Sequence, residues 1–266
     1  MIKKTSMLLL VVLMLMTFVF PAASLGEGEA DLLSRIKERG SIIIATEGDW
    51  SPFTYLNEDN ELVGFDVEVG REIAKGLGVD VQFEVAEWDA ILAGVSSGRF
   101  DLACNGVSYT PERAEAYHFS TPYLYLSSVL AVRDDNEEIK SFDDLQGKKT
   151  ANTISSIYAG IAEEYGATVE GVESLADTIQ LLIQGRVDAT LNAKVSIQDY
   201  MTAHPEAPIK IVDEMMGDIM VIPLQKTESS ESLLAAVNDI LQAMRDDGRL
   251  AALSVKYFGA DLTTQE

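Results

Sequence analysis

The chain has 266 residues, a length that fits one large domain or two domains of ordinary size. Lysine and arginine together number 20 against 43 aspartate and glutamate residues, which gives a formal net charge of −23. This acidic balance argues against nucleic acid as a partner, because phosphate binding requires a basic face.

The N-terminal segment predicts a secretory signal peptide. Lys3 and Lys4 precede an almost unbroken apolar run over residues 7–20, which has the length of a signal-peptide core and is short for a membrane span. Small residues follow in "PAASLGEG", where cleavage after Gly26 is preferred to cleavage after Ser24. We therefore expect residues 1–26 to be removed and the mature protein to be periplasmic. A retained membrane anchor is the less favoured alternative, and no cysteine stands at the cleavage site to carry a lipid.

Helices and strands alternate in the part of the chain that follows. "DLLSRIKERG" has its apolar residues at helical spacing and ends at a glycine, and "SIIIAT" is a short β-branched run typical of a buried strand. We next expect a helix over 65–78, a strand over 79–85, a helix over 88–98 and a strand over 100–104. A long extended segment begins at Tyr123.

A second set of alternating elements follows. The pattern predicts a short helix and turn at 141–149, strands at 150–154, 167–172 and 187–191, and helices at 155–166, 174–185 and 194–205. Two more strands are expected at 209–213 and 219–224, and two helices at 229–248 and 249–259. Strands that alternate with helices indicate an α/β fold with mainly parallel sheets.

A short sequence occurs twice, as "GRFDLACN" from Gly98 and as "GRVDATLN" from Gly185. In both places a predicted helix ends at the glycine, a strand of about five residues follows, and an asparagine ends it. This recurrence favours two similar lobes over coincidence. We expect residues 31–126 and 221–261 to form lobe 1 and residues 127–220 to form lobe 2, with two strands crossing between the lobes.

Only the first copy continues into the turn "TPER". Thr110 suits a helix N-cap and Pro111 suits the first helical position, so Arg113 falls in the first turn, where the helix dipole favours acids instead. Its planar guanidinium, placed beyond the carboxyl end of a strand, matches a carboxylate in two-point hydrogen bonding. The alternative is a surface ion pair with one of the many acids.

Two serines and two tryptophans are further candidates for a binding site. Ser155 and Ser156 stand at a predicted helix start, where free N–H groups can bind an anion or where the hydroxyls only cap the helix. Trp50 and Trp88, the two tryptophans of the chain, each stand just past a strand end. Core packing is the usual role of a single aromatic residue, but this shared placement favours the walls of a pocket.

The composition offers little for a metal or redox site. Cys104 is the only cysteine, so an internal disulfide is excluded, and its apolar surroundings favour a buried hydrophobic role over that of a nucleophile. His118 and His204 are the only histidines, and no metal-ligand spacing is present. We therefore expect no metal and no cofactor.

Four stretches carry a resemblance to a known family: "PFTYLNEDNELVGFDVEVGREIA", "WDAILAGVSSGRFDLACNGVSYTPERAEAYHFSTPY", "GRVDATLNA" and "GRLAALSVKYFG". In this order they resemble the periplasmic amino-acid-binding proteins of ABC importers, solute-binding family 3, which includes histidine, glutamine and cystine receptors. The resemblance covers nearly all of the mature chain. It implies a type II, two-lobed α/β fold in which helices flank a mixed, mainly parallel sheet in each lobe and the ligand lies in the cleft between the lobes.

The resemblance also implies roles for the candidate residues. It assigns Arg113 to the carboxylate of an amino-acid ligand, with Gly106 and Ser108 adding backbone and hydroxyl bonds. Ser155 and Ser156 stand where the family has a Gly-Thr-Thr run, although the glycine is missing here.

Other positions of the family's pocket also have counterparts in this sequence. Trp50 and Trp88 match aromatic walls, and Glu47 matches an acidic position that some members use to contact the ligand. Asn105 and Asn192, which end the two copies of the repeat, are expected at the edge of the same site.

One departure from the family concerns the ligand ammonium. The family usually has an aspartate after Asn192, and this chain has Ala193 there. A carboxylate that pairs a buried cation is not easily dispensed with. Either another acid replaces it, with Glu47 and Asp218 as candidates, or the ligand is not a standard α-amino acid.

The resemblance implies a monomeric receptor, not an enzyme, that binds a small polar amino acid and delivers it to an ABC permease in the inner membrane. Cystine is the first candidate ligand, because the C-terminal segment and "LNAKVSIQDYM" look most like the cystine branch. A receptor for a non-amino carboxylate, or an enzyme of the arogenate or prephenate dehydratase type on the same fold, is the alternative. A sensor domain of a larger receptor is disfavoured, since no second hydrophobic span follows.

Overall fold

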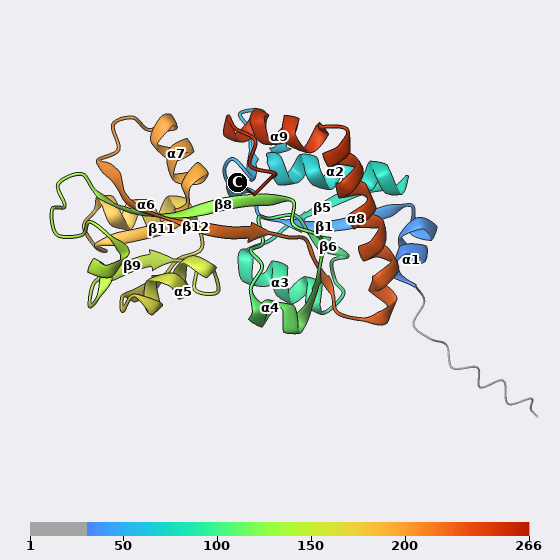
Figure 1. Ribbon diagram of the computed structural model, residues 1–266, viewed down its shortest axis with the longest axis horizontal. Helices are drawn as coiled ribbons and strands as arrows, with labels where there is room; N and C mark the ends of the chain where they lie inside the picture. Colours follow the sequence, from blue (N-terminus) through green and yellow to red (C-terminus); the bar gives the residue numbers. More distant parts are fainter. Residues whose placement is uncertain (1–30, 266) are drawn as a thin grey trace, which may run out of the picture.

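The computed structural model describes residues 31–265, so the expected signal peptide at 1–26 lies outside the described residues. Within this range every helix is too short or too polar to cross a bilayer. The described chain forms two α/β units that lie side by side and share two long strands (Figure 1). This arrangement confirms the expected two-lobed fold.

The first unit is built on a parallel sheet of three strands. β1 (Ser41–Thr46) lies between β5 (Asp80–Val85) and β6 (Leu102–Ala103). Helices flank this sheet on both sides, with α2 on one side and α3 on the other (Figure 1). The flanking helices are α1 (Leu32–Arg39), α2 (Phe65–Leu77), α3 (Trp88–Ser96) and α4 (Pro111–Ala116), and the C-terminal helices α8 (Glu231–Asp246) and α9 (Arg249–Phe258).

The second unit is built on a five-stranded sheet in the order β10-β9-β11-β8-β12. β9 (Lys149–Asn152), β10 (Thr168–Gly171) and β11 (Ala189–Ala193) are parallel to one another, and β8 and β12 add antiparallel pairs. The 3-10 helix η1 (Phe142–Leu145) precedes β9. The flanking helices are α5 (Ile157–Glu164), α6 (Leu175–Ile183) and α7 (Lys194–Ala203).

Two strands connect the units. β8 (Leu124–Arg133) and β12 (Ile209–Met220) pair in antiparallel register from Leu124↔Met220 to Arg133↔Ile209. The expectation of two separate strands at 209–213 and 219–224 is wrong, because the polar stretch between them stays paired to β8 through two register shifts. The chain then continues into β13 (Pro223–Gln225).

Several short elements were not expected. β2 (Asp49–Trp50), β3 (Thr54–Leu56) and β4 (Leu62–Val63) form a small antiparallel sheet, and β7 (Tyr117–Phe119) pairs with β13. A 3-10 helix, η2 (Glu228–Ser230), precedes α8. The strand expected at 100–104 is only two residues long, so most of that stretch is buried loop.

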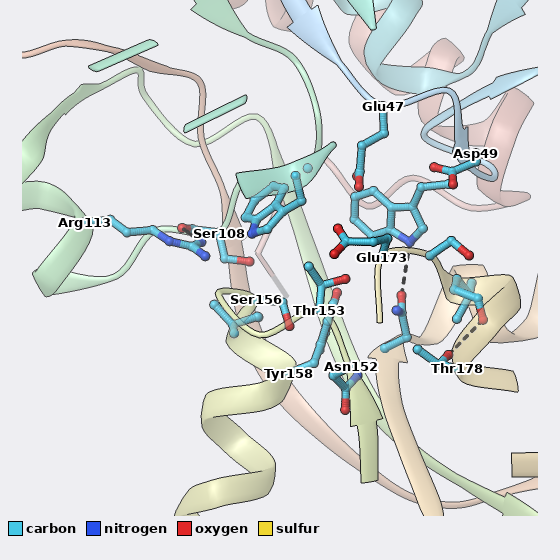
Figure 2. A pocket seen from close by; sticks show the side chains of 17 residues that line it. Glu47, Asp49, Ser108, Arg113, Asn152, Thr153, Ser156, Tyr158, Glu173 and Thr178 are labelled. Carbon is cyan, nitrogen blue, oxygen red and sulfur yellow. Dashed lines mark hydrogen bonds between the residues drawn. The ribbon is translucent and has the colours of Figure 1, made fainter. Parts of the chain in front are cut away.

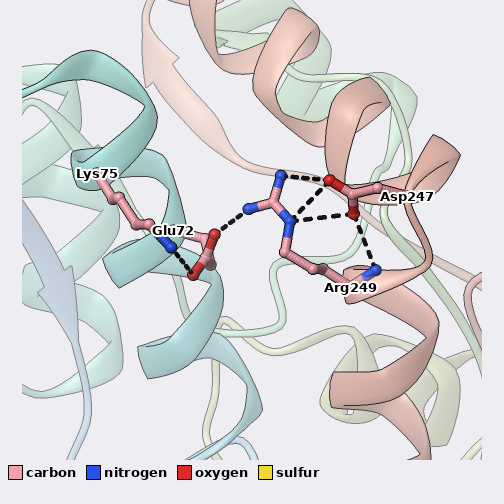
Figure 3. A network of polar contacts seen from close by, with 4 residues as sticks. All are labelled: Glu72, Lys75, Asp247 and Arg249. Atoms are coloured by element: carbon pink, nitrogen blue, oxygen red, sulfur yellow. Dashed lines mark hydrogen bonds and ion pairs between the residues drawn. The ribbon is translucent and has the colours of Figure 1, made fainter.

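The C-terminal helices are tied to α2 by a polar network (Figure 3). The Arg249 guanidinium hydrogen-bonds to Glu72 and pairs with Asp247 at 2.8 Å. Lys75 pairs with the same Glu72 carboxylate at 3.3 Å. The network joins sequence-distant helices, so the C-terminus belongs structurally to the first unit.

The aspartate of the repeated sequence makes the same kind of hydrogen bond in both units. Asp101 accepts a hydrogen bond from the backbone N–H of Ile43 in β1, and Asp188 accepts one from Lys149 in β9, at 2.7 and 2.8 Å. In each unit the repeat aspartate thus binds the strand that its own strand lies beside. The match supports the interpretation of two similar lobes.

Candidate functional site

A pocket opens between the two units and encloses about 600 Å³ of space outside protein atoms, part of it open to solvent. Side chains from both units line it (Figure 2). The first unit contributes Glu47, Asp49, Trp50, Trp88, Gly106, Ser108 and Arg113. The second contributes Asn152, Thr153, Ser156, Ile157, Tyr158, Glu173, Ser174, Leu175, Thr178 and Asn192.

Arg113 supplies the positive charge of the pocket. Thr110 caps α4 as expected, since its hydroxyl accepts from the Arg113 N–H at 3.1 Å, and this holds the arginine in the first turn. The guanidinium donates to the carbonyls of Ser108 and Ser155, both at 3.0 Å, and lies 5.2 Å from the Trp88 ring centre.

No acid of the described chain pairs directly with this guanidinium, although the charge of the neighbouring Glu112 acts on it. Burial lowers the pKa of Arg113, and no acidic side chain within residues 31–265 forms an ion pair with it. A half-buried cation held only by neutral carbonyls is a ready partner for an anion.

Gly106 and Trp50 form one wall together. The backbone of Gly106 has φ +52°, and a Cβ at this position would lie 2.6 Å from the Trp50 ring. Trp50 is stacked on Phe53 with ring centres 4.2 Å apart. Only glycine therefore leaves room for the indole at this wall, and Phe53 lies behind it as a fully buried core residue.

Glu47 lies at the opposite end of the pocket from Arg113 (Figure 2). Burial raises the pKa of its carboxyl to about 7, against the hydrogen bond that Asn105 Nδ2 donates to Oε2 at 2.6 Å. The charges of Asp49, Glu87 and Glu173 raise the pKa further. Burial also raises the pKa of Asp49. This end of the pocket is thus crowded with negative charge.

The two units also contact each other directly across the pocket. The Trp50 indole N–H donates to Asn192 Oδ1 at 3.1 Å, and Ser155 donates from its hydroxyl to Asp89 on α3. Together with the bond from Arg113 to the Ser155 carbonyl, these hydrogen bonds show that the two sides of the cleft are in direct contact.

Eight of the eleven residues predicted from the sequence line the pocket, and their role in ligand binding stays a prediction. Glu47, Trp50, Trp88, Gly106, Ser108, Arg113, Ser156 and Asn192 line the pocket. Asn105 lies behind Glu47, Ser155 contacts Arg113 only through its carbonyl, and Ala193 is fully buried at the N-cap of α7. None of these three lines the pocket.

The second candidate for the ammonium partner, Asp218, is not in the pocket lining either. Its carboxylate accepts from Ser128 at 2.7 Å on the paired strand β8, and burial raises its pKa to about 6. Of the two acids considered as replacements for the missing aspartate, only Glu47 reaches the pocket.

Sequence reasoning missed a whole side of the pocket. Asp49 begins β2, two residues after Glu47, while Glu173 and Ser174 follow β10, and Leu175 and Thr178 belong to α6. The strand-end rule that located Ser108 and Arg113 applies equally to the end of β10, and it could have placed Glu173 at this edge. No group of metal-ligating side chains occurs in the described part of the chain.

The sequence profile of the bacterial extracellular solute-binding proteins, family 3, matches residues 42–260. The chain belongs to this family. The matched range includes both copies of the repeat, the two connecting strands and all the residues that line the pocket. These features therefore belong to a chain of the solute-binding family.

Two curated relatives share most of this sequence. A probable amino-acid ABC transporter-binding protein of Haemophilus influenzae is 36% identical over 233 residues, which are 88% of this chain and 90% of the relative. The L-cystine-binding protein TcyA of Bacillus subtilis is 38% identical over 236 residues, 88% of this chain and 87% of the relative.

Two solved structures differ in how closely they match. An ancestral arginine-binding protein bound to arginine has a TM-score of 0.78 at 33% identity, covering 83% of this chain and 99% of its own. The L-cystine solute receptor of Neisseria gonorrhoeae, in its unliganded open conformation, has a TM-score of 0.56 at 35% identity, covering 89% and 100%. At similar identity, the better match is to the ligand-bound protein.

Proposed function

We propose that this protein is a receptor that captures a small amino acid and delivers it to an ABC importer. The observation that carries the proposal is the polarity of the pocket, in which the Arg113 guanidinium, which has no ion-pair partner among the described residues, and the carboxyl of Glu47 lie at opposite ends (Figure 2). An amino acid is a zwitterion, so its carboxylate matches Arg113 and its ammonium matches Glu47.

The relatives support this role. One is named as an amino-acid ABC transporter-binding protein and another as a cystine-binding protein. We infer that the chain acts outside the cytoplasm after export, as a monomer, and that its partner is an inner-membrane permease.

Capture by such a receptor requires the cleft to open and close. We propose lobe 1 as residues 31–126 and 221–261 and lobe 2 as residues 127–220, with hinge bending where β8 and β12 pass between them. The cross-pocket bond from Trp50 to Asn192 and the better match to an arginine-bound structure than to an open one support a closed arrangement here.

Glu47 also favours a second candidate function. A buried carboxyl with a pKa of about 7 can act as a general acid at neutral pH, as a dehydratase on this fold would need. The test is chromatography of prephenate and arogenate after incubation with the protein. A receptor returns both unchanged, whereas conversion to an aromatic product would establish the enzyme.

The receptor proposal is tested by calorimetry on Arg113→Ala. Loss of the charged partner of a buried carboxylate costs roughly 2–5 kcal/mol, which weakens binding about 30-fold to several thousand-fold. Arg113→Lys is also expected to bind poorly, because an ammonium cannot make the two-point contact. The matched control is Arg186→Ala, since Arg186 is an exposed arginine of the second unit that lies outside the pocket.

The ligands in this test are L-amino acids and their des-amino analogues. We expect the wild-type protein to prefer the amino acids. Near-wild-type binding by Arg113→Ala would remove the carboxylate assignment, and equal binding of the des-amino analogues would make the protein a receptor for simple carboxylates.

A further inference from the structure

The pocket carries more negative charge than an ordinary amino acid can neutralise. Its charged lining residues are one cation, Arg113, and three acids, Glu47, Asp49 and Glu173. No lysine or arginine within the described part of the chain forms an ion pair with any of these acids. If a ligand carboxylate neutralises Arg113 and a ligand ammonium neutralises one acid, the other two acids are left without a positive partner.

These acids come from both sides of the cleft. Glu47 and Asp49 follow β1 of the first unit, and Glu173 follows β10 of the second. Figure 2 shows the Glu47 and Glu173 side chains in the same part of the pocket, with Arg113 away to the other side. Closure therefore brings like charges together, and this repulsion disfavours closure unless a cation lies between them.

Two more acids strengthen this field. Glu87 acts on both Glu47 and Asp49 from the first unit, and Asp177 acts on Asp49 from the second. Glu47 is half-buried and the other four acids are exposed, so solvent screens part of this repulsion, but all five charges have the same sign and favour a bound cation.

A buried acceptor in the same pocket independently indicates a ligand donor. Asn152 is 1% exposed and lines the pocket, and its Oδ1 has no hydrogen-bond partner. A buried acceptor without a donor is unfavourable unless a bound molecule supplies one. Because the described residues contain no cluster that could hold a metal ion, an organic cation fits these acceptors better than a metal does.

We propose that the ligand is an amino acid with a positively charged side chain, and that this charge lies beside Glu173 of lobe 2 when the cleft closes, while Glu47 of lobe 1 pairs with the ligand ammonium. The inference rests on the proposed receptor function. It disfavours cystine, because the second carboxylate of cystine would lie among these acids.

The test compares ligands that differ in side-chain charge and little in shape. Calorimetry is carried out with L-arginine against L-citrulline, its neutral ureido counterpart, and with L-lysine against L-norleucine, with L-cystine as a further arm. We expect at least one cationic ligand to bind tenfold or more tightly than its neutral counterpart and more tightly than cystine. Equal affinity within both pairs, or a preference for cystine, would overturn the proposal.

Variants then locate the charge. Glu173→Gln is expected to reduce the preference for the cationic ligand over its neutral counterpart at least fivefold, while the neutral counterpart binds as before. The matched control is Glu170→Gln, since Glu170 is exposed on β10 and outside the pocket, and it should keep the full preference. A preference that Glu173→Gln leaves intact would contradict the assignment of Glu173.

The two proposals fail in different ways. If neutral amino acids bind as well as cationic ones, the receptor function stands and only the charge assignment falls. If no amino acid binds at all, the receptor function itself falls and this inference falls with it.

Discussion

Binding of an amino acid is expected to release protons from Glu47. With the cleft closed, as in this structure, this carboxyl has a pKa of about 7, so about half of the molecules carry the proton at pH 7. Opening of the cleft hydrates the carboxyl and lowers this pKa, so the numbers of released protons that follow from this pKa are upper limits. A ligand ammonium beside the carboxylate favours the ionised form and lowers this pKa. Binding should therefore release about 0.9 proton at pH 6, about 0.5 at pH 7 and about 0.1 at pH 8.

The same linkage sets the pH dependence of affinity. Below pH 7 the ligand must displace the proton of Glu47. The affinity therefore falls as the pH falls through the pKa of this carboxyl. Between pH 8 and pH 6 the predicted loss is about tenfold, or about 1.4 kcal/mol.

Calorimetry in two buffers of different ionisation enthalpy, phosphate and Tris, measures the released protons directly. Glu47→Gln cannot ionise and should release none, and the matched Glu61→Gln, at an exposed turn position, should behave as the wild type. Equal heats in the two buffers at pH 7 would refute the reasoning. Proton release that persists in Glu47→Gln would assign it to another group, with Asp49 the first alternative.

Two further predictions follow from the pocket wall and the hinge. Gly106→Ala should destabilise the protein by about 1–3 kcal/mol in chemical unfolding, because the left-handed backbone and the Trp50 contact both oppose a Cβ. Gly78→Ala has the same sign of φ but open space around it, so it should lose less and keep its ligand affinity. Solution scattering should show compaction of the protein on saturation with ligand, and unchanged dimensions would count against hinge closure at β8 and β12.

The alternating elements of the fold were predictable because their hydrophobic patterns are local. α1 shows this well, since Asp31 caps its start and Gly40 ends it in the left-handed conformation. β12 was not predictable in the same way, because residues 214–218 include three polar or glycine positions and are extended only through pairing with β8. Pairing between distant strands overrides local preference there.

The residues of the candidate site also differ in how well the sequence alone predicts them. Arg113 and Ser108 were found because a strand end and a helix cap mark them in the sequence, and the family resemblance agreed. Glu173 is marked only by its place after the end of β10, and whether it lines the pocket depends on how the second unit lies against the first. Ala193 indicated that the ammonium partner or the ligand differs from the usual one, and only the three-dimensional arrangement shows that Glu47, and not Asp218, lines the pocket.

Trp50 and Trp88 are the two tryptophans of the chain, and both line the pocket. Trp50 donates its indole N–H across the cleft to Asn192, and the Trp88 ring lies under the Arg113 guanidinium. All indole emission from this protein therefore originates at the pocket that we propose as the ligand site. Tryptophan fluorescence can therefore report binding directly. Opening of the cleft exposes Trp50 to water, and a carboxylate bound at Arg113 changes the charge next to Trp88.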